Sequence, residues 1–328
     1  MGKRLNPRHG SMQFWPRVRA KKAYARVRSL PDVKEVKPLV FAGYKAGMTH
    51  VIVTDNDKNS LTKGEKVAYP VTVVECPSLK ISSVRFYEPA GYGSKITKEL
   101  FFKVDKEFSK RAPVSKTLST AQDLDKVDLT NVTNITVVAY TQPKQTGLGK
   151  KTPEIFEMGL GGSNEEKITF LKEKIASEIT ASDVLSVGSM VDVRAVTKGK
   201  GNQGPVKRFG ISLRAKKSEK VKRGPGSLGG WKAQGHVMYR IAYSGQTGYH
   251  QRTQYNNLIL GIYDDVEKVN PKGGFVDFGL VKANYVLVKG SIPGTKKRLV
   301  TLTAPLRVSK KKATPTVEFI SIESKQGN

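Results

Sequence analysis

Lysine and arginine side chains gather in two stretches of this chain, and their chemistry is the binding of phosphate groups. Residues 1–30 contain no carboxylate, and residues 198–226 contain only Glu219. Such segments repel themselves and bury too little apolar surface to offset chain entropy, so we expect a polyanion to order them. The basic residues expected to contact it are Lys3, Arg4, Arg8, Arg17, Arg19, Lys21, Lys22, Arg26 and Arg28 in the first stretch, and Lys198, Lys200, Lys207, Arg208, Arg214, Lys216, Lys217, Lys220, Lys222 and Arg223 in the second.

The charge of the whole chain indicates nucleic acid as the partner. Its formal net charge is +29 over 328 residues. Basic residues that replace counterions on phosphates supply most of the affinity of nucleic-acid-binding proteins. An anionic membrane surface is the alternative, but the basic stretches are rich in glycine and proline rather than amphipathic, which argues against it. No membrane partner is therefore expected.

Length and composition limit the class of protein. The chain is long enough for one large domain or two smaller ones, and at 38% hydrophobic it can build a core. Its start lacks the apolar segment of a secretory signal, and Pro7, Gly10 and Pro16 disfavour the helix of a mitochondrial presequence. The single Cys76 fits a reducing compartment.

Aromatic and histidine side chains accompany the basic ones. Phe14 and Trp15 lie inside the first stretch, where they either stack on bases or anchor this N-terminal arm to the protein itself. Trp231 and Lys232 lie in a glycine-rich segment, and we expect Trp231 to wedge against nucleotides, with packing on the protein as the alternative. The remaining expected RNA contacts in these polar segments, for which a structural role is the alternative, are His236, His250 and Arg252.

Enzymatic chemistry finds little support. Residues 199–204 match the G-x-G-x-x-G pattern of dinucleotide-binding proteins, which delivers a pyrophosphate to a helix N-terminus. Pro205, Gly210 and the repelling lysines are expected to prevent a clean helix there, which favours a flexible loop instead. No zinc spacing or hydrolase motif is present, and the Asp-x-Asp-x-Asn run at 55–59 is expected to be a hairpin turn. We therefore expect no catalytic residues, metal, cofactor or small-molecule substrate.

The spacing of apolar residues predicts a β-rich chain of the α+β class. Short runs rich in Val, Ile and aromatics predict a closed β-barrel, with strands at Leu39–Tyr44, Thr49–Thr54, Ala68–Glu75, Val84–Tyr87, Met190–Val196, His236–Ala242, Leu258–Tyr263, Tyr285–Lys289, Leu299–Thr303 and Thr316–Ile322. Between them, residues 90–182 read as an inserted α/β subdomain. It would contain a helix over 94–111, a strand over 134–141, and a helix that begins with the capping-box pair Ser163 and Glu166.

These elements divide the chain into four expected parts. Residues 1–38 form an extended basic arm, because four prolines interrupt them. The barrel core comprises 39–89 and 183–328, and the inserted subdomain lies between its two parts. A long basic loop within the barrel, over 197–257, carries Trp231.

Several motifs resemble the family of large-subunit ribosomal protein L3 in its archaeal and eukaryotic form, and we expect an archaeal member. They lie at residues 7–11, 43–49, 196–199, 235–238 and 245–250. The first and second of these motifs contain His9 and Lys45, which become further expected RNA contacts.

The resemblance implies a fold and a function. The fold would be a six-stranded barrel of the translation-protein type, with the arm and the loop entering RNA. The protein would bind large-subunit rRNA near its 3′ end and help nucleate subunit assembly in the cytoplasm. The tip of its loop would approach the peptidyl-transferase region, and its neighbours would be ribosomal proteins fourteen and twenty-four-e. An RNA-modifying enzyme and a DNA-architectural protein are the two alternatives.

Overall fold

The chain forms two compact units. The computed structural model describes residues 14–218, 221–228, 235, 237, 239–308 and 314–324. Unit 1 comprises Met1–Lys22 and Val196–Gln251, and unit 2 comprises Ala23–Ala195 and Arg252–Asn328. Unit 1 therefore contains the start of the arm together with the second basic stretch, and unit 2 contains the two larger sheets.

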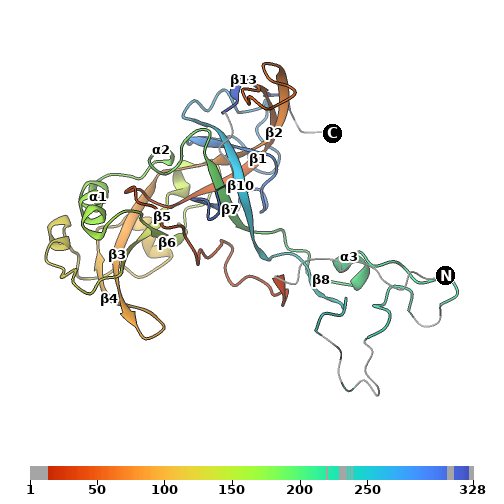
Figure 1. Ribbon diagram of the computed structural model, residues 1–328, viewed down its shortest axis with the longest axis horizontal. Coiled ribbons are helices and arrows are strands. Elements are labelled where there is room, and N and C mark those ends of the chain that lie inside the picture. The colour runs from red at the N-terminus through yellow and green to blue at the C-terminus, as the bar shows by residue number, and fades with distance from the viewer. Residues whose placement is uncertain are drawn as a thin grey trace. The chain divides into compact units, whose positions relative to one another are not determined.

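The larger sheet of unit 2 has the strand order β12-β7-β10-β11-β2-β1-β13, and β1 pairs with β12 as well. Figure 1 shows β7 and β10 side by side, in agreement with this order. The prediction of a β-rich chain is confirmed. The strands are β1 (Val40–Thr54), β2 (Lys66–Glu75), β7 (Met190–Val196), β10 (Gln251–Tyr263), β11 (Tyr285–Lys289), β12 (Leu299–Thr303) and β13 (Thr316–Ile320).

Strand β1 joins two segments that the sequence predicts as separate strands. The register against β2 shifts between Lys45 and Gly47, which marks a β-bulge. A Cβ atom on Gly47 would lie 2.6 Å from the ring of Phe275. Glycine at this position leaves room for the Phe275 ring, and the strand continues through the bulge. From the sequence alone, the same glycine indicates the end of a strand.

The second sheet has the order β4-β3-β5-β6. One helix, α1 (Asn164–Ala176), packs against β3 and β5 of this sheet (Figure 1). The capping box is confirmed: Ser163 N donates to Glu166 Oε2 at 2.9 Å, and Glu166 N donates to Ser163 Oγ at 3.4 Å. The sheet consists of β3 (Leu79–Ala90), β4 (Gly93–Phe101), β5 (Asn134–Thr141) and β6 (Ile155–Gly159), and the short helix α2 (Ala181–Val184) follows α1.

The helix predicted over 94–111 is wrong. Strand β4 occupies its first half, and a 3-10 turn, η2 (Lys106–Lys110), lies near its end. Apolar residues four apart share one face of a helix, but because four is an even number they also share one face of a strand. The tight turn at Gly91–Gly93 decides between the two, since it folds β4 back onto β3 as a hairpin.

Several strands of unit 2 lie where the sequence predicts them. The bounds of β5, β7, β11 and β12 match the predicted ranges. Residues 55–65 connect β1 to β2 as a hairpin, so the turn expected at 55–59 is confirmed. Two further 3-10 turns are η3 (Ala121–Leu124) and η4 (Pro143–Gln145). Within the residues described here, no helix is long and apolar enough to cross a bilayer.

A buried polar cluster joins the two sheets of unit 2. The Tyr44 hydroxyl, on β1, donates to Glu154 Oε2 at 2.5 Å and lies 2.9 Å from Thr141 Oγ1 at the end of β5. Glu154 Oε1 forms an ion pair with Lys150. Tyr44 is fully buried within a hydrophobic cluster that continues through both sheets.

Unit 1 contains only short elements among its described residues. They are β8 (Asn202–Gln203), α3 (Pro205–Phe209) and β9 (Gly245–Gln246). The expectation that no helix follows Gly204 is wrong, because proline is favourable at the first position of a helix and Gly210 ends α3 in the left-handed conformation. The strand predicted over 236–242 is also not formed in its described residues.

Candidate nucleic-acid interface

A two-stranded ribbon forms the base of unit 1. Residues 197–203 pair with 245–250 through Thr197 N to His250 O at 2.9 Å, Lys200 N to Thr247 O at 2.9 Å, and the β8–β9 pairing. Gly248 has φ +74°, and a Cβ atom there would lie 2.0 Å from Lys198 O. Only glycine allows this close approach, which holds the two basic segments of the ribbon together.

Arg208 fastens α3 to the ribbon. Its Nε donates to Gln246 O at 3.1 Å, and its Nη1 donates to Tyr243 O at 3.0 Å. Burial, and then the positive charge of Arg17, lower the pKa of Arg208. Arg208 is half-buried, and its hydrogen bonds hold α3 against the ribbon. Its positive charge adds to that of Arg17.

The N-terminal arm is attached to α3 by an aromatic and cationic stack. The rings of Trp15 and Phe209 lie 5.6 Å apart at an interplanar angle of 20°, and Tyr239 meets Trp15 edge-on at 6.4 Å. The Arg17 guanidinium lies 4.3 Å from the centroid of Phe209, and its Nη1 donates to Arg208 O at 3.3 Å. The anchoring role considered for Trp15 is thus supported, and its anchor is the second basic stretch.

Backbone contacts continue the attachment beyond the stack. Ala20 N donates to Tyr249 O at 2.7 Å, and the Nδ1 of His250 lies 2.8 Å from Val18 O. The Arg19 guanidinium lies 5.2 Å from the ring centroid of Tyr249. His250 is buried between the arm and the ribbon, which supports the structural alternative for its ring.

Most of the predicted basic contacts in unit 1 are exposed. Two halves of the second basic stretch turn back on each other, with Arg214 N donating to Lys222 O at 3.2 Å. The predicted contacts of unit 1 whose cationic groups are exposed are Arg19, Lys21, Lys22, Lys198, Lys200, Lys207, Arg214, Lys216, Lys217, Lys222 and Arg223. Phe14 is exposed as well.

Charge is distributed very unevenly between the two units. The sequence of unit 1 contains 19 basic residues and one carboxylate, Glu219, so it carries +18 of the chain's formal +29. Its described residues contain no carboxylate side chain. Residues 1–22 of the arm and the second stretch, separated by more than 170 residues in sequence, form one cationic body because they contact each other.

The other predicted contacts lie elsewhere. Arg26 and Arg28 are exposed in unit 2, Arg252 is half-buried and Lys45 is buried. Lys3, Arg4, Arg8, His9, Lys220, Trp231, Lys232 and His236 lie outside the described residues.

Four residues that take part were not predicted from the sequence: Tyr239, which meets Trp15 edge-on, and three others. Phe209 and Tyr249 hold the arm, and Arg240 is exposed in the same unit. Phe209 directly follows Lys207 and Arg208. An aromatic residue next to two cations could therefore have indicated its role from the sequence. Nothing in the sequence pairs it with Trp15.

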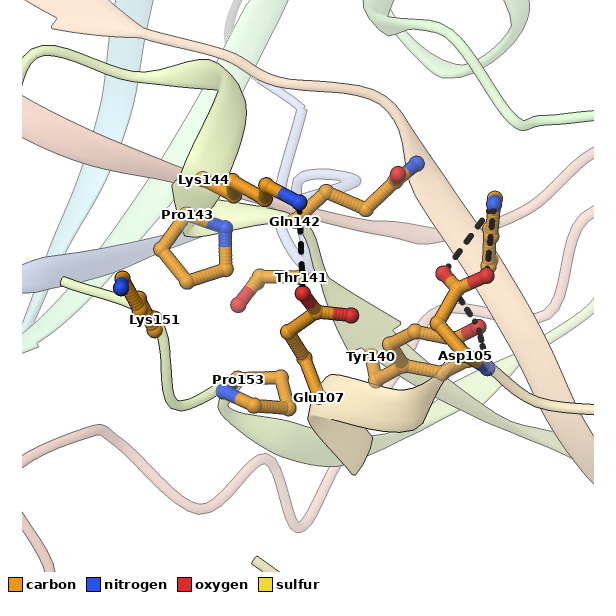
Figure 2. Close-up of a pocket in the computed structure, with 10 residues that line it drawn as sticks. Asp105, Glu107, Tyr140, Thr141, Gln142, Pro143, Lys144, Lys151 and Pro153 are labelled. Carbon is orange, nitrogen blue, oxygen red and sulfur yellow. Dashed lines mark hydrogen bonds and ion pairs between the residues drawn. The ribbon is translucent and has the colours of Figure 1, made fainter. Parts of the chain in front are cut away.

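Unit 2 has a surface hollow of about 220 Å³ between β5 and η2, shown in Figure 2. Lys80 Nζ contacts both oxygens of Asp105, at 3.2 and 3.1 Å, and Lys144 Nζ lies 3.4 Å from Glu107 Oε1. The Tyr140 hydroxyl donates to Asp105 Oδ2 at 3.1 Å. Each carboxylate is engaged by a cation, so the hollow is a polar surface held by ion pairs rather than a set of groups poised for catalysis.

Comparison with known proteins identifies the family. The family described as ribosomal protein L3 matches residues 1–327. The chain belongs to the ribosomal protein L3 family. It is 46% identical over 98% of its length to a protein of Methanobrevibacter smithii named large ribosomal subunit protein uL3, again covering 98% of that protein. It is 42% identical, over the full length of both chains, to the protein of the same name from Methanothermobacter thermautotrophicus.

Membership confirms the expected resemblance and its general consequences. Proteins of this family are structural constituents of the large ribosomal subunit rather than enzymes, and they reside in the ribosome in the cytoplasm. The archaeal relatives match along 98–100% of the chain.

Proposed function

We propose that the chain binds large-subunit rRNA directly and that unit 1 is its main contact surface. The observation that carries this proposal is the concentration of +18 in unit 1, opposed by a single carboxylate. Phosphates are the groups that such a surface binds, because each contact releases condensed counterions from the RNA. Specificity would come from RNA shape and stacking more than from a code of base contacts.

The arm and the ribbon supply complementary parts of this mechanism. The stack of Trp15, Phe209 and Arg17 fixes the arm on the ribbon, so that exposed cations from both segments present one surface. A surface assembled before binding loses less conformational entropy on the RNA than two independent segments would. Phe14, whose side chain is exposed, is a further candidate for stacking on bases.

The finer assignments are proposals that follow from family membership. We place the RNA site near the 3′ end of the large-subunit rRNA and give the chain a role in nucleating assembly. The loop around Trp231 would extend toward the peptidyl-transferase region. Ribosomal proteins fourteen and twenty-four-e would be its neighbours in the subunit.

We propose that unit 2 contains a closed barrel, which serves as the platform on which the protein docks to the RNA. Its six strands would be β1, β2, β11, β10, β7 and β12. The pairing of β1 with both β2 and β12 supports closure, because β1 and β12 are the first and last of these six strands in the sheet order. The parts expected from the sequence are the arm at 1–38, the barrel at 39–89 and 183–328, the inserted subdomain at 90–182 and the loop at 197–257, and we propose them with one boundary changed. Strand β3 pairs in the second sheet and favours a subdomain start near Leu79.

A cross-linking map of the full chain on intact large-subunit rRNA, at two salt concentrations, tests this function. We expect discrete cross-links from residues 14–22 and from 198–223 that persist at the higher salt. A matching competition with duplex DNA separates rRNA recognition from general binding of polyanions. Diffuse cross-links that disappear with salt, or equal competition by DNA, would overturn the proposal.

A further inference from the structure

One loop of unit 2 carries three consecutive basic residues outside both basic stretches. Lys296, Lys297 and Arg298 lie in the connection between β11 and β12, residues 290–298. Unlike unit 1, unit 2 is of mixed charge, with 38 basic and 27 acidic residues in its sequence. Among the described residues of unit 2, this loop alone has three consecutive cations; the sequence has a second such run, Lys310–Lys312, outside the described residues.

Lys45 holds the loop in place from β1. Its Nζ donates to Ile292 O at 2.7 Å and to Gly294 O at 3.3 Å. Its backbone pairs with the same loop, since Lys297 N donates to Lys45 O at 2.9 Å and Lys45 N donates to Arg298 O at 3.2 Å. Lys45 is only 9% exposed. Its ammonium therefore stabilises the shape of the loop rather than contacting a ligand.

The loop presents Lys297 in a conformation that this residue type rarely adopts. Lys297 has φ +69° and an exposed side chain. A left-handed residue other than glycine is strained and persists where its surroundings impose it, often at functional sites. The hydrogen bonds of Lys45 are the surroundings that impose it here.

The electrostatics of the loop favour an added anion. Lys296 Nζ lies 3.3 Å from Asp277 Oδ2, whose side chain is 74% exposed, so this ion pair is weak and easily exchanged. Burial, and then the charge of Lys296, lower the pKa of Lys45. A phosphate beside Lys297 would reduce this repulsion among the cations.

We propose that residues 294–298 form a phosphate-binding loop through which unit 2 contacts the rRNA backbone, with Lys297 as the principal contact and Lys45 as a positioning residue. This proposal rests on the proposed function and extends it from unit 1 to unit 2. The chemistry favours RNA over a protein partner, because Ile292 is buried, Pro293 is half-buried, and the exposed residues of the loop, Ser291 and Lys297, are polar. Phosphate oxygens match such a surface, whereas a protein interface would need an apolar core.

Lys297→Asn is the decisive variant, because asparagine tolerates the left-handed conformation and the change removes the positive charge. The assay is filter binding of the full chain to the large-subunit rRNA of Methanobrevibacter smithii over a series of salt concentrations. Loss of one phosphate contact should reduce the slope of log K against log salt by about 0.7–0.9, and the affinity by roughly sixfold at about 0.1 M salt. Lys297→Arg should bind as wild type does, and Lys58→Asn, an exposed lysine in the β1–β2 hairpin, should leave the slope unchanged.

Lys45→Met tests the positioning role. It should reduce the salt slope although the Lys45 ammonium is buried, an effect that a purely structural change elsewhere in the sheet would not have. If this variant fails to fold, Lys297→Asn still decides the proposal. A slope for Lys297→Asn equal to that of Lys58→Asn would overturn the loop as a phosphate site while leaving unit 1 as an RNA surface. Failure of the wild-type chain to prefer rRNA over duplex DNA would instead overturn the proposed function.

Discussion

Removal of one hydroxyl group from Tyr44 should destabilise unit 2 measurably. The phenol is fully buried, donates to Glu154 Oε2 at 2.5 Å and contacts Thr141 Oγ1 at 2.9 Å. Burial raises the pKa of Tyr44 strongly, so the phenol stays neutral and remains a donor over the whole range of ordinary pH. Tyr44→Phe keeps the ring but deletes the donor.

The magnitude follows from the kind of bond that is lost. A hydrogen bond to a charged group contributes about 1.5–3 kcal/mol to stability. A buried acceptor that has lost its donor also carries an uncompensated free-energy cost of desolvation. Lys150 still pairs with the other Glu154 oxygen, which limits the penalty. We therefore expect a loss of about 2 kcal/mol in the free energy of unfolding. In a unit of this size that corresponds to roughly 4–8 °C in Tm.

The same substitution on the second sheet provides a matched control. The Tyr87 hydroxyl donates to Glu157 Oε1, also at 2.5 Å, but at an exposed position. Tyr87→Phe should cost less than about 0.5 kcal/mol, because water replaces the lost partner. Urea unfolding of both variants, followed by far-UV circular dichroism, gives the two free energies. Equal losses for Tyr44→Phe and Tyr87→Phe would refute the reasoning that burial sets the size of the effect.

Three further changes have expected outcomes of their own. Burial raises the pKa of the Glu75 carboxyl above its ordinary 4.5, so its ionisation opposes folding as pH rises from about 4.5. Relative to wild type, Glu75→Gln should therefore gain stability between about pH 4 and about pH 7 in urea unfolding. Gly248→Ala should open the ribbon, because its Cβ would meet Lys198 O, and limited proteolysis should then cleave residues 197–250 faster. Trp15→Ala should speed hydrogen exchange of the Ala20 amide roughly 3- to 10-fold, as expected for loss of an aromatic pair.

Each of these has a control on the same chain. A pH-independent difference for Glu75→Gln would mean that the carboxyl titrates alike in the folded and unfolded states. Gly199→Ala, whose Cβ would make only an ordinary 3.5 Å contact with Tyr249, should leave proteolysis unchanged. Tyr243→Ala removes a ring that is 51% exposed and keeps the backbone carbonyl that Arg208 contacts, so it should leave the Ala20 amide protected. Equal exchange in the Trp15 and Tyr243 variants would contradict the stack.

Local signals in the sequence determined much of this protein. The Ser163 and Glu166 capping box placed the start of α1, and β-branched runs placed β5 and β11 at their observed bounds. Hydrogen bonding and side-chain packing over a few residues control these features, so a short window of sequence contains them. Composition likewise located both cationic segments and indicated a nucleic-acid partner, because net charge is additive along the chain.

Only the tertiary structure decided how distant segments combine. The four-residue spacing over 94–108 fits a helix or a strand, and the hairpin with β3 selects the strand. The stack of Trp15 on Phe209 joins residues almost 200 positions apart, and nothing local to either ring indicates the other. In the sequence, nothing distinguishes Lys45 from the other cations. In the structure it is buried, and its ammonium donates to the carbonyls of residues 292 and 294. Long-range contacts of this kind depend on how the sheets pack, and packing is a property of the whole chain rather than of any stretch of it.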